Sequence, residues 1–143
     1  MYDILIDQIK SEVTKLGVKE LRTPEEVDAL LANHKGTALV FVNSVCGCAG
    51  GVARPALKLA LGHAVRPDVV TTVFASGDRE ATARAREYFT GMLPSSPSFA
   101  LLRDGKLVHM IHRSDIEMCE PVEVAKLLTN AFDKYCAATL SQN

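Results

Sequence analysis

Two cysteines separated by a single glycine, Cys46-Gly47-Cys48, are the residues of this sequence best suited to covalent chemistry. A nearly continuous apolar run at 37–43 precedes them and is typical of a strand covered on both faces, while the spacing after them predicts a helix over about 47–61. In the first turn of a helix, unpaired N–H groups and the positive end of the macrodipole stabilise a thiolate over a thiol. Gly47 lets the chain turn tightly between the two sulfurs, and a bridge across so short a span is a constrained ring that is easily reduced. The turn therefore predicts thiol–disulfide chemistry through a transient disulfide.

Two other interpretations of the Cys-x-Cys pair stay open. The pair is half of a zinc site only if the fold brings two more ligands to it, and Cys119, His109 and His112 are the candidates. The odd offset between His109 and His112 places them on opposite faces, which disfavours a shared metal, so no metal is expected. The cysteines could also be two small apolar residues without a reaction of their own, but an exposed turn does not favour that interpretation.

Pro97 is the next residue with a chemical role to consider. Ser96-Pro97 precedes the apolar run 98–103, which predicts a strand antiparallel to 37–43 that starts at the edge where 37–43 ends. Pro97 is therefore expected beside Cys46. An X–Pro bond adopts the cis form at small cost, and a cis bond here would present the Ser96 backbone to an extended peptide or a thiol compound. The alternative is an ordinary loop proline before a strand.

The elements that position these residues follow from apolar spacing and from helix and turn signals. Asp104-Gly105 predicts a hairpin, Pro55 is expected to bend its helix, and Asp78 is expected to cap another. This pattern predicts an α/β fold with a central mixed four-stranded sheet, its first two strands parallel, and helices on both faces. Residues 1–35 are expected to form an N-terminal helical extension and 36–143 the core of a single domain. The expected elements are helix 3–16, helix 24–33, strand 37–43, helix 47–61, strand 69–75, helix 78–92, strand 98–103, strand 106–112 and a last helix over about 121–135.

Composition excludes several classes of protein. The chain has 143 residues, of which 48% are hydrophobic and 23% charged, as expected for one compact domain and not for a disordered chain. With 16 basic and 17 acidic side chains the net charge is −1, which leaves no general basic field for nucleic acid or for a membrane surface. No apolar run approaches the ~20 residues of a transmembrane helix, and Asp3 and Asp7 stand where a secretory signal would be basic. We therefore expect a cytoplasmic protein, in which paired cysteines indicate redox chemistry or metal binding.

The dithiol turn and the proline ahead of the third strand resemble those of the thioredoxin fold, and four segments together resemble the bacilliredoxin family more narrowly. The resemblance covers nearly the whole chain and implies a cytoplasmic thiol–disulfide oxidoreductase that removes bacillithiol from mixed disulfides on proteins, with weak disulfide isomerase activity in some members. In the family's pattern the first cysteine attacks and the second resolves, which implies these roles for Cys46 and Cys48. A cysteine near the C-terminus is matched by Cys136, whereas Cys119 is not part of the pattern. The segments are VNSVCGCAGG at 42–51, ARPA at 53–56, REYFTG at 86–91 and PSSPS at 94–98.

The resemblance also implies the partners. Cys46 would attack the bacillithiol sulfur of a bacillithiolated client protein, and Cys48, a separate reductase or a free thiol would then clear the adduct. Bacillithiol acts here as a thiol substrate, and no tightly bound cofactor is expected. Because bacillithiol carries carboxylates, a cation is expected near the turn. Arg54 is the first candidate, ahead of Arg79 and Arg113, although Arg54 could also be a solvated helix residue.

The remaining cysteines are sorted by their distance along the last helix. Fifteen residues at ~1.5 Å each place Cys136 about 22 Å from the start of that helix, too far to resolve Cys46 within one molecule. Packing, or a contact between chains, is expected for Cys136, and Cys119 is a candidate auxiliary thiol.

Two other functions stay open beside that of a bacilliredoxin: a general protein disulfide isomerase or oxidase, and a non-catalytic thioredoxin-like module that binds a partner or senses a metal.

Overall fold

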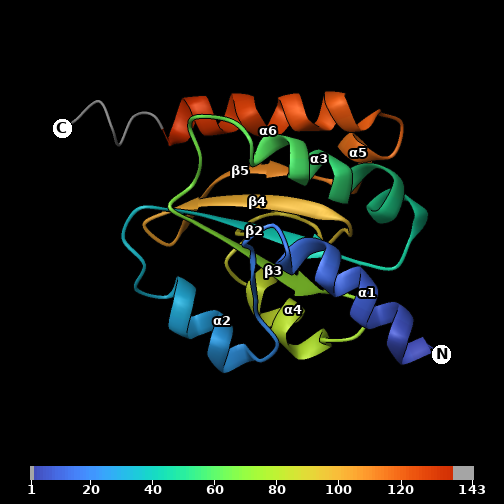
Figure 1. Cartoon of the computed structure of the whole chain (residues 1–143). Helices are drawn as coiled ribbons and strands as arrows, with labels where there is room; N and C mark the ends of the chain where they lie inside the picture. The colour runs from blue at the N-terminus through green and yellow to red at the C-terminus, as the bar shows by residue number, and fades with distance from the viewer. Residues whose placement is uncertain (1, 137–143) are drawn as a thin grey trace.

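The computed structural model describes residues 2–136 and shows, in that part of the chain, a five-stranded mixed sheet covered by helices on both faces (Figure 1). The strand order is β1-β3-β2-β4-β5, with β1, β3 and β2 parallel to one another and the β4–β5 hairpin antiparallel to β2. The elements in chain order are α1 (Tyr2–Thr14), β1 (Lys19–Glu20), α2 (Pro24–Leu31), β2 (Thr37–Asn43), the π-helix η1 (Ala49–Ala53), α3 (Arg54–Ala60), β3 (Val69–Phe74), α4 (Arg79–Arg86), β4 (Ser98–Arg103), β5 (Lys106–Ile111), α5 (Arg113–Ile116) and α6 (Pro121–Tyr135).

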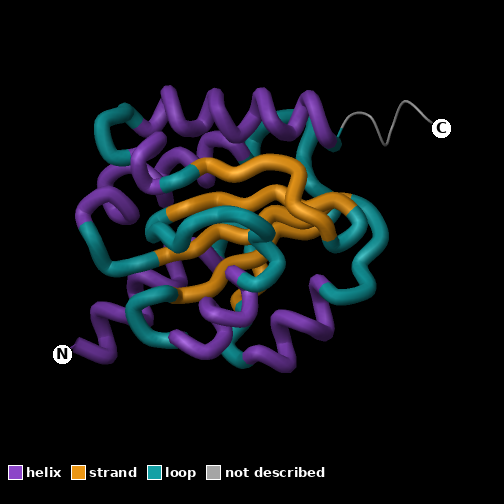
Figure 2. Tube along the Cα trace, turned by 180° about the vertical axis from the view of Figure 1, so that it is seen from behind, coloured by secondary structure: helices purple, strands orange, loops and turns teal. Residues whose placement is uncertain are grey.

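The central strand β2 is buried along its whole length, as its apolar run predicted. Leu39 and Phe41 face the layer formed by α1, η1, α3, α5 and α6, whereas Val40 and Val42 face the layer formed by α2 and α4. Figure 2 shows the sheet between these two layers of helices. Alternate residues of a strand point to opposite faces, so a strand covered on both sides is apolar at consecutive positions, as β2 is from Ala38 to Val42.

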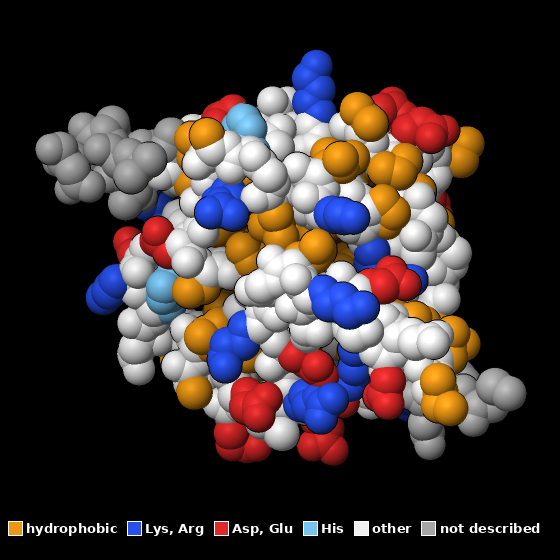
Figure 3. All heavy atoms as spheres, in the orientation of Figure 1, with side chains coloured by type: hydrophobic (Ala, Val, Ile, Leu, Met, Phe, Trp, Pro, Cys, Tyr) orange, Lys and Arg blue, Asp and Glu red, His pale blue; other side chains and the backbone are white. Residues whose placement is uncertain are grey.

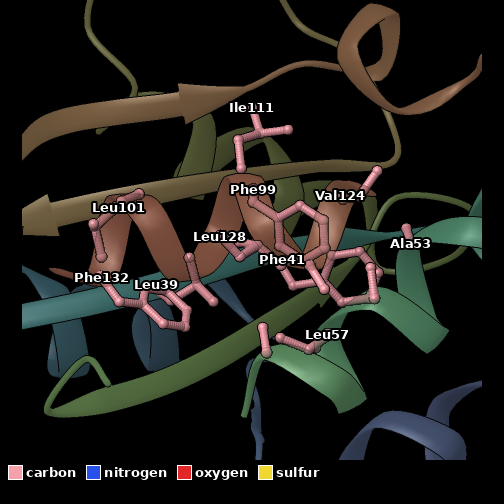
Figure 4. Packing of buried hydrophobic residues seen from close by; sticks show 14 of the residues in the cluster. Leu39, Phe41, Ala53, Leu57, Phe99, Leu101, Ile111, Val124, Leu128 and Phe132 are labelled. Carbon is pink, nitrogen blue, oxygen red and sulfur yellow. The ribbon is translucent and has the colours of Figure 1, made fainter. Parts of the chain in front are cut away.

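Aromatic packing fixes β2 against β4. Phe41 stacks on Phe99, with ring centroids 4.7 Å apart, and Leu57 and Phe132 close the same cluster from α3 and α6 (Figure 4). Full burial of a side chain of this size contributes about 1.5–3 kcal/mol. The strand that leads into the Cys46 turn is therefore held firmly from both faces.

The segment 1–35 differs from the expected helical extension because it also supplies a strand. β1 pairs in parallel with β3, with Lys19 opposite Thr71, and so adds a fifth strand to the four that were expected. Two residues are too few to show an alternating apolar pattern, and this is why the sequence did not reveal the strand.

Two helices also differ from the expectation. The helix after the cysteines begins as a π-helical turn, in which the Arg54 N–H donates to the Ala49 carbonyl, and becomes α-helical only from Arg54. Pro55 has no N–H to donate to the preceding turn, and a widened turn ahead of it is one way to accommodate that loss. α4 ends at Arg86 and not near 92, and Phe89, in the turn that follows, is buried in the α2–α4 layer.

The sequence predicted a hairpin turn at Asp104-Gly105 and a helix cap at Asp78, and the structure confirms the turn but not the capping bond. The β4–β5 hairpin closes on Asp104 and Gly105, both with positive φ (52° and 80°), which confirms the expected Asp-Gly turn. Asp78 stands at the N-cap of α4, but its side chain makes no capping bond. Its carboxylate instead accepts a hydrogen bond from Lys10 Nζ at 2.7 Å, which ties α1 to this end of the sheet.

The surface carries both signs of charge. On the face drawn in Figure 3, lysine and arginine side chains are interspersed with aspartate and glutamate and form no single large basic area. Within residues 2–136, no helix combines the length and apolar character required to cross a bilayer.

Candidate redox active site

The dithiol turn and Pro97 lie at the same end of the sheet because β2 and β4 are paired antiparallel. Val42 stands opposite Ser98, so the chain that leaves β2 toward Cys46 passes the chain that enters β4 from Pro97. This is the right-hand end of the sheet in Figure 1. The Ser96–Pro97 peptide bond is cis, as expected from the sequence, and Pro97 is buried.

Cys46 is half-buried, unpaired and in contact with a serine hydroxyl. Its Sγ lies 3.1 Å from Ser44 Oγ, and its carbonyl accepts the N–H groups of Ala49 and Gly50, which begin the helical turn. Burial raises the pKa of the Cys46 thiol. Four groups lower this pKa by more than burial raises it: the Ser44 hydroxyl, the Ala49 N–H, the positive charge of Arg113 and the Cys48 N–H. The pKa of Cys46 therefore lies below the ordinary value for a cysteine. These groups favour the thiolate because each offers a donor or a positive charge to the ionised sulfur.

Arg113 is the arginine whose charge acts on the two cysteines. It opens α5, and its exposed guanidinium donates to the Ser96 carbonyl at 3.3 Å and to Glu117 at 3.3 Å. The pKa of Arg113 is raised, first by the hydrogen bond with Glu117 and then by the charges of Cys46 and Cys48. Arg113 thus links the cis-proline loop to the dithiol turn, and it is the best-placed cation of the three that the sequence suggested.

The structure contradicts the expected substrate-facing role of Arg54. Only 8% of this residue is exposed, and its guanidinium donates from Nη1 to Asn43 Oδ1 (3.0 Å) and the Ser44 carbonyl (3.0 Å), and from Nε to Glu12 (2.9 Å). Because this guanidinium is buried as well as bonded within the protein, Arg54 is not free to bind the carboxylate of a thiol compound. Arg79, the other candidate, is exposed at the start of α4.

Cys48 and Gly47 complete the turn. Cys48 is half-buried and stands at the N-cap of η1. Gly47 is exposed, and a Cβ added to it would meet no atom within 4 Å. Steric crowding around the free dithiol therefore does not explain why position 47 is glycine.

The other two cysteines lie in different surroundings. Cys136 is buried at the end of α6, where burial raises the pKa of its thiol beyond what a hydrogen bond with Thr37 offsets. Thr37 begins β2 and Cys46 follows its end, so Cys136 and Cys46 lie at opposite ends of this strand. Cys119 is half-buried against the core beside α6, and its suggested auxiliary role stays a prediction.

The two histidines suggested as zinc ligands lie on β5 and directly after it. His109, on β5, packs near the ring of Tyr135, with centroids 6.0 Å apart, while the His112 N–H donates to Asp115 at the start of α5. Over residues 2–136, the His, Cys, Asp and Glu side chains form no group of three placed to hold a metal ion.

Asn43 and Ser44 are site residues that sequence reasoning missed. Both are buried. Asn43 is the last residue of β2, after the apolar run 38–42, and Ser44 follows it. Polar residues at the end of a buried strand are unusual enough to serve as a signal, because buried polar groups need hydrogen-bond partners. Here those partners are each other and Arg54.

Comparisons with known proteins find relatives of this chain along nearly its whole length. The Disulphide isomerase family model matches residues 2–136. A bacilliredoxin of Geobacillus kaustophilus is 57% identical over 136 residues, covering 95% of this chain and 93% of the relative. A bacilliredoxin of Halalkalibacterium halodurans is 53% identical, covering 93% of this chain and 91% of the relative, and one of Staphylococcus aureus is 52% identical, covering 92% and 90%.

Solved structures show the fold. The thioredoxin of Malassezia sympodialis superposes with a TM-score of 0.58 at 12% identity, covering 83% of this chain and 90% of that one. A mutant thioredoxin from Halobacterium salinarum gives a TM-score of 0.57 at 18% identity, covering 82% and 89%. The expected thioredoxin-like α/β fold is thereby confirmed, with five strands in place of four.

The Ser44 hydroxyl gives the first testable prediction. Replacing it in Ser44→Ala removes a donor to the ionised sulfur, so the pKa of Cys46 rises and the thiolate fraction falls at any pH below that pKa. A hydrogen bond worth about 1 kcal/mol corresponds to a roughly fivefold slower alkylation of Cys46 near neutral pH, with the rates converging at high pH. The measurement is the pH dependence of iodoacetamide labelling in a Cys48→Ser background, read by mass spectrometry.

Ser11→Ala is the matched control, because the Ser11 hydroxyl binds only the Gln8 carbonyl of its own helix among the hydrogen bonds described for residues 2–136. Its labelling profile should be that of the parent. An unshifted profile in Ser44→Ala would show that this hydroxyl does not stabilise the thiolate.

Proposed function

The chain belongs to the bacilliredoxin family and is a thiol–disulfide oxidoreductase, and on that premise we propose that it removes bacillithiol from mixed disulfides on client proteins. Cys46 is the attacking thiolate and Cys48 the resolving thiol. The single observation that carries the proposal is the half-buried Cys46 sulfur, at the end of the sheet that also holds cis-Pro97, with the Ser44 hydroxyl 3.1 Å away and the pKa of the thiol lowered.

The proposed reaction is two successive exchanges. The Cys46 thiolate attacks the bacillithiol sulfur of the client's mixed disulfide, so that a new S–S bond forms on Cys46 and the client leaves as a thiolate that takes up a proton. The Cys48 thiolate then attacks Cys46, which forms the Cys46–Cys48 disulfide and releases bacillithiol. Two electrons have passed from the dithiol to the client, and a dithiol reductase or free low-molecular-weight thiols must return them.

Arg113 supports the choice of a thiol that carries carboxylates. The Arg113 side chain is 45% exposed, and its charge acts on both cysteines, so an anionic group attached to Cys46 would meet a positive charge. Guanidinium–carboxylate pairs are short and directional, and this makes arginine suited to select such a ligand. The Ser96 carbonyl, held by the same guanidinium, and the buried Pro97 are proposed to border the bound disulfide together with Gly47.

We also place this reaction in the cytoplasm, since regeneration of the dithiol requires a reducing compartment. The reductant is a separate protein or a free thiol. No tightly bound cofactor takes part in the proposed reaction.

Turnover of a bacillithiolated protein by cysteine variants tests the roles of the two sulfurs. Cys46→Ser should abolish release of the client thiol, because the attacking sulfur is lost. Cys48→Ser should still release one client thiol per protein and then stop, with bacillithiol bound to Cys46, because the resolving sulfur is lost. Client release is followed by thiol titration, and the adduct by the intact mass of the protein.

Cys136→Ser is the matched control, since it removes one sulfur outside the turn, at the opposite end of β2 from Cys46. Full turnover by Cys46→Ser, or loss of the first release in Cys48→Ser, would contradict the assigned order.

Arg113→Gln tests the binding of the carboxylates. We expect KM for the bacillithiolated client to rise, by roughly three- to tenfold for the loss of one exposed charge-assisted contact. For the same client carrying neutral 2-mercaptoethanol, KM should stay near that of the parent. Both substrates should share a smaller loss of rate at neutral pH, since the pKa of Cys46 rises when the nearby positive charge is removed.

Arg79→Gln removes another exposed arginine from α4 and should leave both KM values unchanged. Equal increases of KM for the charged and the neutral adducts in Arg113→Gln would show that Arg113 does not select carboxylates.

The second candidate function, general disulfide isomerisation, is favoured by the description of the matching family, Disulphide isomerase. The same turn could run both reactions. Refolding of a scrambled disulfide protein, compared with bacillithiol removal at equal protein concentration, separates the two: faster turnover of scrambled disulfides would favour the isomerase.

A further inference from the structure

A buried hydrogen-bond network centred on Arg54 includes Ser44, the residue whose hydroxyl contacts Cys46. Arg54 Nη1 donates to Asn43 Oδ1 and to the Ser44 carbonyl, both at 3.0 Å, and all three of these residues are more than nine-tenths buried. Asn43 Oδ1 also accepts the Ser44 N–H at 2.9 Å. The Ser44 main chain is therefore held on both sides, at its N–H and at its carbonyl.

This hold fixes the side chain that contacts the sulfur. Ser44 Oγ lies 3.1 Å from Cys46 Sγ, and its direction depends on the Ser44 backbone from which it projects. A hydroxyl can donate to the thiolate only when it is aimed at the sulfur, because hydrogen bonds weaken steeply as the angle closes. Arg54 touches neither cysteine in the hydrogen bonds described for residues 2–136, and its charge is not among the causes that shift the pKa of Cys46, so we expect its influence on Cys46 to pass through Ser44.

Two further features keep the Arg54 guanidinium in place. Gly50 leaves the space that it occupies: a Cβ on Gly50 would stand 2.8 Å from Nη2 and 3.8 Å from Cζ. From the other side, Glu12 of α1 accepts a hydrogen bond from Nε at 2.9 Å and balances the buried charge. Helix α1 is thereby connected to the dithiol turn through one side chain.

We infer that Arg54 is a positioning residue for the oxidoreductase: held by Glu12 and given space by Gly50, it fixes Asn43 and Ser44 so that the Ser44 hydroxyl is aimed at Cys46. The inference rests on the proposed function for the role of Cys46 as nucleophile. It makes no use of a direct contact between Arg54 and substrate.

The experiment compares two variants that disturb the guanidinium in different ways. Arg54→Lys keeps the positive charge but cannot reproduce the forked donors. Gly50→Ala leaves Arg54 in the sequence but places a methyl group where its guanidinium lies. Gly51→Ala is the matched control, because it makes the same substitution in the same π-helical turn, where a Cβ would meet nothing within 4 Å.

The measurement is the rate of Cys46 alkylation against pH in the Cys48→Ser background, for each variant with and without Ser44→Ala. With Ser44 present, Arg54→Lys and Gly50→Ala should each slow labelling near neutral pH by roughly two- to fivefold, the value of one hydrogen bond, and Gly51→Ala should not. With Ser44→Ala, neither substitution should slow labelling further, because residues that act through one another are not additive.

A slowing by Arg54→Lys that is equally large in both backgrounds would overturn the inference, since it would mean that Arg54 acts without Ser44. Equal effects of Gly50→Ala and Gly51→Ala would also overturn it. Circular dichroism and urea unfolding of each variant establish that the labelled protein is folded, and Gly50→Ala keeps the test available if Arg54→Lys does not fold. Labelling requires no bacillithiol, so failure of the wild type to release bacillithiol would contradict the proposed function and leave this result standing.

Discussion

The hydrogen bond between Ser44 Oγ and Cys46 Sγ is the interaction on which the site depends. A half-buried sulfur resists ionisation, because burial penalises the charged form. Ser44, the N–H groups of Ala49 and Cys48, and the charge of Arg113 together outweigh that penalty, and Ser44 is the largest of these favourable contributions. The largest favourable contribution to the thiolate thus comes from one neutral hydroxyl at close range, and the start of a helical turn and one exposed cation add to it.

The fold provides this arrangement through two strand ends. β2 is held by apolar packing on both faces, so Asn43 and Ser44 leave it from a rigid position. β4 pairs antiparallel with β2, which brings cis-Pro97 to the same end of the sheet. The loop before β4 is fixed in turn by Arg86 and Arg113, which donate to the carbonyls of Ser95 and Ser96.

Much of this could be predicted from the sequence, where local signals were strong. The run that became β2, the Asp104-Gly105 hairpin and the position of Pro97 follow from apolar spacing, turn chemistry and strand direction. The role of Arg54 could not be predicted, because its direction depends on the π-helical turn and on Glu12, which is 42 residues away in the chain. β1 escaped prediction because two residues show no period. The sequence also could not show that Arg113 is better placed than Arg54, because its approach to the turn depends on α5 packing against the loop before β4.

The most direct test of this account is the apparent pKa of Cys46 in the folded protein, measured beside an unfolded peptide of the same residues, 42–51, with serine at 48. The pH dependence of alkylation gives both values under one set of conditions. The account predicts that Cys46 ionises at lower pH in the folded protein than in the peptide, since the peptide lacks the fixed donors and Arg113. An equal or higher pKa in the folded protein would contradict it, because the fold would then contribute nothing to the reactivity of the sulfur.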